Sequence, residues 1–100
     1  MKFGLNTAAW TELEQLLLAP LKKAGAKVWI FGSRARGDYK EYSDLDVLVE
    51  FSGDAPQGLL GSIRMDLEDS SLPIKVDIVE RKNLAFSYTP QVEQEKILLL

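Results

Sequence analysis

The chain has 100 residues, 46% of them hydrophobic and 27% charged, so it can build one hydrophobic core, and we expect a single domain over residues 1–100. Its net charge of −3 at neutral pH disfavours nucleic acids and anionic membranes as partners. Cysteine and histidine are both absent, which excludes thiolate chemistry, imidazole bases and the commonest zinc sites and leaves carboxylates, hydroxyls, Lys, Arg and hard metal ions.

The first half of the chain predicts a helix followed by a buried strand. Apolar residues recur at helical spacing over residues 10–21, and Pro20 is expected to kink or split this helix near its end, because proline lacks the N–H that a helix interior uses. The run 27–31, Lys-Val-Trp-Ile-Phe, is β-branched and aromatic, which predicts a strand. A polar segment that contains glycine follows over residues 33–43.

The second half predicts a strand, a helix, a strand and a helix. Residues 44–51 give the clearest strand pattern, and the turn after them places Pro56 near the start of the next helix. Apolar residues share one helical face over 59–67 and alternate along the strand predicted over 74–79. Thr89-Pro90 indicates the start of a terminal helix that reaches Leu100. This order predicts an α/β fold with a small mixed sheet flanked by helices.

Two carboxylates stand at the start of the strand 44–51. Asp44 and Asp46 are two residues apart, so the strand period of two places both on one face, with Leu45 and Val47 on the other. Such close like charges repel each other unless a cation lies between them. A pair of Mg²⁺ ions about 3.5–4 Å apart is the usual arrangement for phosphoryl transfer, and Mg²⁺ takes carboxylates, waters and substrate phosphates as ligands.

Asp77 is the natural third carboxylate of this site. It stands mid-strand between Val76 and Ile78, where a carboxylate is costly to bury without a partner. If its strand neighbours that of Asp46, its side chain can reach the same metal and accept or orient the proton of an attacking hydroxyl. Taken alone, Asp77 fits a surface position on an edge strand equally well.

The loop after the strand 27–31 carries groups that suit a phosphate. Gly32 lets the backbone approach a ligand closely, and Ser33 is expected to cap a short helix that starts there, whose free N–H groups attract anions. Arg34 and Arg36 lie within reach of the same charge. A Gly-Ser pair alone is more often a plain turn, and two such arginines are more often solvated. The order and spacing of all these features favour a nucleotide site.

The residues between Gly32 and Asp46 resemble a family signature. Gly32-Ser33, ten intervening residues and Asp44-Leu45-Asp46 resemble the motif of the DNA polymerase beta nucleotidyltransferase superfamily. The fuller run 31–38, Phe-Gly-Ser-Arg-Ala-Arg-Gly-Asp, resembles the minimal nucleotidyltransferases of bacteria and archaea, and Val76-Asp77-Ile78-Val79 is similar to the last strand of that family. The resemblance covers most of the chain and implies the nucleotidyltransferase fold.

The resemblance also implies an activity and its site. That activity is transfer of a nucleoside monophosphate, AMP in the first instance, from a nucleoside triphosphate such as ATP to a hydroxyl, with release of pyrophosphate. Asp44 and Asp46 are implied as ligands of two Mg²⁺ ions, with Mn²⁺ as an alternative ion. Asp77 is implied as a ligand of the ion that activates the acceptor, and Gly32 and Ser33 are implied to hold the triphosphate.

The acceptor is expected on another polypeptide, because 100 residues leave no room for a separate acceptor-binding domain. The resemblance implies a small helical-bundle companion of the HEPN type, in a toxin–antitoxin module whose antitoxin neutralises the toxin by transferring AMP to it. Two alternatives stay open. One is a catalytic subunit that acts on a small molecule or a nucleic-acid end, and the other is a non-catalytic nucleotide-binding module that masks its partner.

The two ends of the chain add two expectations. Residues 1–6 lack the apolar core of a secretion signal, and no apolar run approaches the roughly 20 residues that span a bilayer, which favours a cytoplasmic protein. Four consecutive apolar residues, 97–100, cannot all face one core from a helix. Some of them should be exposed in a monomer and are candidates for self-association or partner binding.

Overall fold

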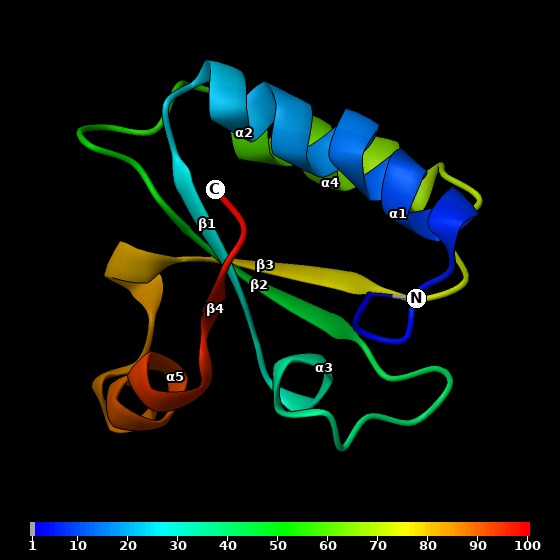
Figure 1. The fold of residues 1–100 in the computed structure, drawn as a ribbon. Helices are drawn as coiled ribbons and strands as arrows, with labels where there is room; N and C mark the ends of the chain where they lie inside the picture. Colours follow the sequence, from blue (N-terminus) through cyan, green and yellow to red (C-terminus); the bar gives the residue numbers. More distant parts are fainter. Residues whose placement is uncertain (1) are drawn as a thin grey trace.

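A four-stranded mixed sheet forms the centre of the computed structural model, which describes residues 2–100 (Figure 1). The strand order is β3-β2-β1-β4. Strand β1 pairs antiparallel with both β2 and β4, whereas β2 and β3 run parallel. The predicted α/β fold with a mixed sheet is therefore confirmed. The strands are β1 Lys27–Phe31, β2 Leu45–Glu50, β3 Val76–Glu80 and β4 Ile97–Leu98.

Helices cover one face of this sheet. The first rod consists of α1 (Thr7–Leu13), the π-helical segment η1 (Glu14–Leu18) and α2 (Ala19–Lys23), and it lies beside α4 (Leu59–Glu68) (Figure 1). Between the helices and the sheet lies the main core. Its buried members include Leu13, Leu17, Leu21, Val28, Ile30, Leu45, Val47, Val49, Ile63, Leu67 and Ile78.

The interruption predicted at Pro20 takes the form of the π-helical segment. The N–H of Ala19 donates to the carbonyl of Glu14, five residues back, and the rod then continues as α2 with Pro20 in its first turn. Proline is tolerated in that position because the N–H groups of a first helical turn need no intrahelical partner. At α4 the N-cap is Gly58, so Pro56 lies ahead of the helix rather than inside its first turn.

The other face of the sheet carries shorter elements. After β3 the chain passes through the 3-10 turns η2 (Arg81–Asn83) and η3 (Phe86–Tyr88) into α5 (Thr89–Glu95). Helix α5 and the short helix α3 (Ser33–Arg36) lie on the opposite side of the sheet from α1, α2 and α4 (Figure 1). A second, smaller apolar cluster forms under α5, with Trp29, Leu48 and Val92 as its buried members.

The end of the chain differs from the prediction of a helix to Leu100. Helix α5 ends at Glu95, and Ile97–Leu98 form β4 beside β1; next to it, the Leu99 N–H donates to the Val28 carbonyl at 2.7 Å. Leu99 and Leu100, which follow β4, are partly buried and pack against the main core.

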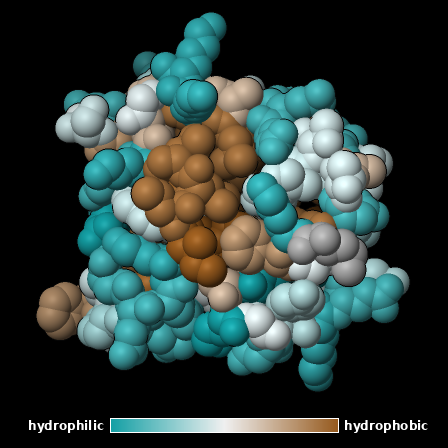
Figure 2. All heavy atoms as spheres, viewed as in Figure 1, coloured by the Kyte–Doolittle hydropathy of each residue, from teal (hydrophilic) through white to brown (hydrophobic). Residues whose placement is uncertain are grey.

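Part of this tail is open to solvent, as the sequence predicted. Ile97 is 39% exposed and Leu98 is 59% exposed. Figure 2 shows an apolar patch where the C-terminal segment lies, and Leu98 lines a hollow there with Trp10 and Leu18. Self-association through this patch stays a prediction. Over residues 2–100, no helix combines the length and the apolar character that a membrane span requires.

Candidate active site

Asp46 and Asp77 lie side by side in the sheet. Strands β2 and β3 are parallel neighbours, and their register pairs Asp46 directly with Asp77. On β2, the flanking Leu45 and Val47 are buried in the main core, so the pleat turns Asp46 toward the opposite face, on the side of α5. The neighbouring strand that the sequence analysis required for Asp77 is therefore present.

Asp44 lies immediately before strand β2. Strand β2 begins at Leu45, so Asp44 lies in the loop just before it and is exposed. Its charge still acts on Asp46, because it is one of the groups that raise the pKa of that carboxyl. Asp44 is thus close enough to Asp46 for its charge to act on that carboxyl.

Gly32 is required both by its backbone conformation and by its neighbour. Its φ is +77°, in the region that side chains other than glycine rarely adopt. A Cβ at this position would lie 2.2 Å from Oδ2 of Asp46. The Asp46 carboxylate therefore lies directly against the backbone of the loop, and the absence of a side chain at Gly32 permits this approach.

Ser33 does not cap α3 as predicted. The N-cap is Gly32, whose carbonyl accepts from the N–H groups of Ala35 at 3.1 Å and Arg36 at 3.0 Å, and no side chain caps this end. The helix starts one residue earlier than a serine cap requires. Ser33 is consequently the first residue of α3, where its N–H belongs to the first turn and has no carbonyl within the helix to bond.

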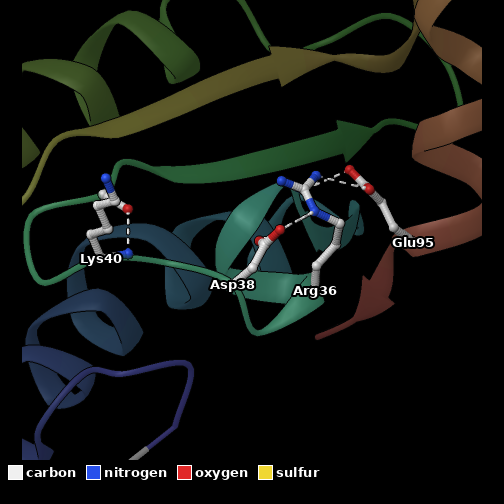
Figure 3. A network of polar contacts seen from close by, with 6 residues as sticks. Arg36, Asp38, Lys40 and Glu95 are labelled. Atoms are coloured by element: carbon white, nitrogen blue, oxygen red, sulfur yellow. Dashed lines mark hydrogen bonds and ion pairs between the residues drawn. The ribbon is translucent and has the colours of Figure 1, made fainter.

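Glu95 is a residue of the site that the sequence analysis missed. Its Oε1 accepts a hydrogen bond from the Gly32 N–H at 2.9 Å, and its Oε2 pairs with Nη1 of Arg36 at 3.1 Å (Figure 3). It comes from the last turn of α5, 63 residues from Gly32. The sequence held no signal for this contact, because one more glutamate in a polar helix looks like a solvated residue.

The two arginines of α3 are separated by the fold. Arg34 is 2% exposed and donates to three backbone carbonyls, those of Phe3 at 2.8 Å, Ser43 at 2.9 Å and Glu41 at 3.0 Å. It therefore holds the loop before Asp44, and its guanidinium is engaged away from the predicted nucleotide site. Arg36 instead lies at the surface beside Glu95 (Figure 3).

Gly32, Arg36, Asp46, Asp77 and Glu95 meet at an open pocket of about 350 Å³ between the sheet and α5, whereas Ser33, Arg34 and Asp44 do not line it. Its size is in the range of small-ligand sites. One part of the wall is charged and the rest is apolar, a combination that suits a ligand with a phosphate chain and a flat base. The lining residues are Phe31, Gly32, Arg36, Asp46, Asp77, Val79, Leu84, Tyr88, Gln91, Val92 and Glu95.

The electrostatics of the pocket leave negative charge in excess. Burial raises the pKa of the Asp46 carboxyl, and the charges of Asp77, Asp44 and Glu95 raise this pKa further, while Arg36 lowers it. A raised pKa means that the ionised carboxylate is held at a cost. A cation bound beside Asp46 would remove that cost.

The donor set fits Mg²⁺ held jointly with a phosphate ligand. Among residues 2–100, no three Asp or Glu side chains come close enough together to hold a metal ion alone. Asp46 and Asp77 supply two carboxylates on one face, and Mg²⁺ commonly binds through one or two carboxylates together with waters and substrate phosphates. The arrangement therefore suits an ion that enters with a nucleotide.

Comparison with known proteins gives the chain a family. Residues 9–100 match a protein family described as a nucleotidyltransferase domain. A protein of Methanocaldococcus jannaschii, assigned as a protein adenylyltransferase, is 42% identical over 55 residues. That match covers 55% of this chain and 63% of the relative, so the chain spans less than two thirds of that relative's length.

Solved structures agree with this match. A structure described as a minimal nucleotidyltransferase is 33% identical, with a TM-score of 0.71, and the alignment covers 95% of this chain and 97% of that one. A toxin–antitoxin complex with AMP-PNP contains a chain of similar fold, with a TM-score of 0.67 and coverage of 87% of this chain and 72% of that one. Its identity of 20% supports the fold alone.

Proposed function

The chain belongs to the nucleotidyltransferase domain family, and on that premise we propose that it is an enzyme that transfers AMP from ATP to a hydroxyl on a partner protein. The observation that carries this proposal is the pairing of Asp46 with Asp77 beside the Gly32 backbone. The M. jannaschii relative, assigned as a protein adenylyltransferase, supports a protein as the acceptor.

The carboxylates are proposed to bind the metal–nucleotide complex. Asp46 and Asp77, with Asp44 reaching in from the loop, would hold two Mg²⁺ ions, or Mn²⁺ in their place, together with the triphosphate. Bound ions of this kind neutralise charge on the phosphates and on the attacking and leaving oxygens. The support is the raised pKa of the Asp46 carboxyl, to which burial contributes most and the charges of Asp77, Asp44 and Glu95 add.

The loop and Arg36 are proposed to bind the triphosphate. The N–H and hydroxyl of Ser33 lie at the start of α3, where an unpaired N–H attracts anions, and Gly32, whose own N–H donates to Glu95, lets the backbone approach the phosphates. Arg36 lines the pocket and adds a fixed positive charge. Arg34 is left out of this proposal because its donors already serve three carbonyls. We assign it to positioning the loop that carries Asp44.

Asp77 is proposed to receive the acceptor hydroxyl. It lies on β3, which is an edge strand of the sheet, and it lines both the nucleotide pocket and a hollow that runs along this edge past Arg64 and Lys75. The acceptor oxygen would attack the α-phosphorus from this side and pass its proton to the Asp77 carboxylate. The bond from the α-phosphorus to the bridging oxygen then breaks, and pyrophosphate leaves.

The partner is proposed to be a small helical-bundle protein of the HEPN type, with this chain as the antitoxin of the pair. This partner and this donor rest on the family resemblance of residues 31–46, and a toxin–antitoxin complex with AMP-PNP contains a chain of the same fold. The net charge of −3 makes a nucleic-acid acceptor the weaker alternative.

The experiment is a transfer assay with labelled ATP. The purified chain is incubated with Mg²⁺ and α-labelled ATP, alone and with its companion protein, beside the double variant Asp44→Ala/Asp46→Ala. We expect label on the companion only with intact carboxylates, and a loss of at least about 10³-fold in the variant, because bound metal supplies several kcal/mol of charge stabilisation.

A parallel reaction with γ-labelled ATP is the control, since transfer of AMP leaves the γ-phosphate in pyrophosphate. Label from γ-labelled ATP on the companion would show a kinase instead. Normal binding to the companion with no label from either ATP would contradict the proposal and leave a module that masks its partner by contact.

A further inference from the structure

We infer that Glu95 is a positioning residue for the nucleotide, and that it acts by holding Arg36 and the Gly32 loop ready for the triphosphate. The inference rests on the proposed function and deepens it, because it assigns a role in nucleotide binding to the C-terminal helix. Neither of the sequence motifs that mark the site contains Glu95 or any other residue of α5 (Thr89–Glu95).

One carboxylate joins two parts of the candidate phosphate site. Oε1 of Glu95 accepts from the Gly32 N–H at 2.9 Å, while Oε2 pairs with Nη1 of Arg36 at 3.1 Å. The Glu95 side chain is only 12% exposed, against 40% for Arg36. The glutamate is therefore the fixed member of the pair, and the arginine is the member that it orients.

Helix α5 gives Glu95 its fixed position. Val92 lies one turn earlier on the same side of the helix and is buried in the cluster with Trp29 and Leu48. This packing holds the last turn of α5 against the sheet. The chain leaves the helix at Lys96, whose backbone is extended, so Glu95 is the last helical residue and faces the loop.

Arg36 is held from two sides. Its Nε lies 3.3 Å from each carboxylate oxygen of Asp38, and its Nη1 points to Glu95 (Figure 3). Within the described part of the chain, this leaves Nη2 to meet a ligand oxygen. A guanidinium that is already oriented loses less freedom when it binds an anion, so this arrangement should strengthen nucleotide binding.

The alternative role for the Glu95 carboxylate is that of a competitor, which would occupy the position of a phosphate at the Gly32 loop. The hydrogen bonds favour the positioning role, because Glu95 accepts from only one N–H of this loop, that of Gly32. The next two N–H groups, those of Ser33 and Arg34, lie in the first turn of α3 and have no carbonyl within the helix to bond. The two roles predict opposite changes in nucleotide affinity, so one measurement separates them.

The test compares Glu95→Gln, Arg36→Gln and the double variant with the wild-type chain. The glutamine amide oxygen can keep the Gly32 hydrogen bond, but it loses the ion pair with Arg36. Calorimetry gives Kd for a non-hydrolysable ATP analogue with Mg²⁺, and the transfer assay gives KM and kcat. For Glu95→Gln we expect Kd and KM to rise about tenfold with a smaller change in kcat, as for other supporting contacts. In the Arg36→Gln background, Glu95→Gln should add no further loss.

Glu93→Gln is the matched control, because Glu93 lies on α5 but pairs with Lys96 and Arg81 instead of the loop. It should leave Kd unchanged. Tighter nucleotide binding in Glu95→Gln, or independent losses from the two substitutions, would overturn the inference and leave the proposed function intact. Wild-type chain that binds no nucleotide would overturn the proposed function, and the inference with it.

Discussion

The two faces of the sheet carry different kinds of residue, although the same strands supply both. On β2, Val47 and Val49 face the helices α1, α2 and α4 and are fully buried. The alternate residue Asp46 faces the pocket under α5, among charged side chains. The comparison teaches that one strand contributes packing energy on one face and a chemical site on the other. Substitutions on the two faces should therefore affect stability and nucleotide binding separately.

The largest effect on stability should come from the helix-covered face. Leu17 is 1% exposed in the main core, and Leu17→Ala should lower the free energy of unfolding by about 3 kcal/mol, from lost burial and the cavity left behind. Urea denaturation measures this loss. At a temperature where the variant is folded, its nucleotide Kd should equal that of the wild-type chain; a large change in Kd would show that the two faces are coupled.

The two arginines of α3 give the next contrast. Arg34→Met should lower the free energy of unfolding by about 2 kcal/mol, because it removes the partner of three backbone carbonyls. Arg36→Met should leave stability nearly unchanged, since its ion pairs are at the surface.

The same two arginine variants should affect nucleotide binding in the opposite order. Calorimetry with Mg²⁺ and the ATP analogue should show a higher Kd, and so weaker binding, for Arg36→Met. The Kd of folded Arg34→Met should change less. Equal losses of stability in the two variants would contradict the separation of their roles.

The smallest effect concerns pH and the charge on Asp46. Its folded pKa is raised above the ordinary 3.8, so the folded state binds more protons than the unfolded state between those two values. The stabilisation that this carboxyl contributes to the metal-free chain should therefore be fully present below pH 3.8. It should be lost as pH rises through the raised pKa.

Asp46→Asn is the control for this pH effect, because the amide cannot ionise. Thermal melts in a pH series should show a weaker decline within that window in the variant than in the wild-type chain. A variant whose stability declines as steeply as that of the wild-type chain across the window would contradict the raised pKa of Asp46.

The elements that follow from local pattern were predicted well. The run 27–31 became β1 with the same ends, and the period of two correctly placed Leu45 and Val47 away from Asp46. Both results depend on residues that are close in the chain. The family resemblance was confirmed by the match over residues 9–100.

The features that depend on distant contacts were not predictable. Strand β4 exists because β1 offers it a free edge, whereas the sequence of the tail alone favoured a helix. The charge of Arg34 was visible, but the three carbonyls that fold around it were not. Glu95 joins the site across 63 residues, a separation that periodicity cannot report.

The most direct test of the central claim is to find which face of the sheet binds the nucleotide. A ¹⁵N-labelled chain is titrated with Mg²⁺ and the non-hydrolysable ATP analogue, and amide shifts are followed by NMR. We predict that Gly32, Asp46, Asp77 and Glu95 shift, while the amides of α1 and α4 stay in place. Shifts confined to the helix-covered face, or none at saturating analogue, would contradict the account.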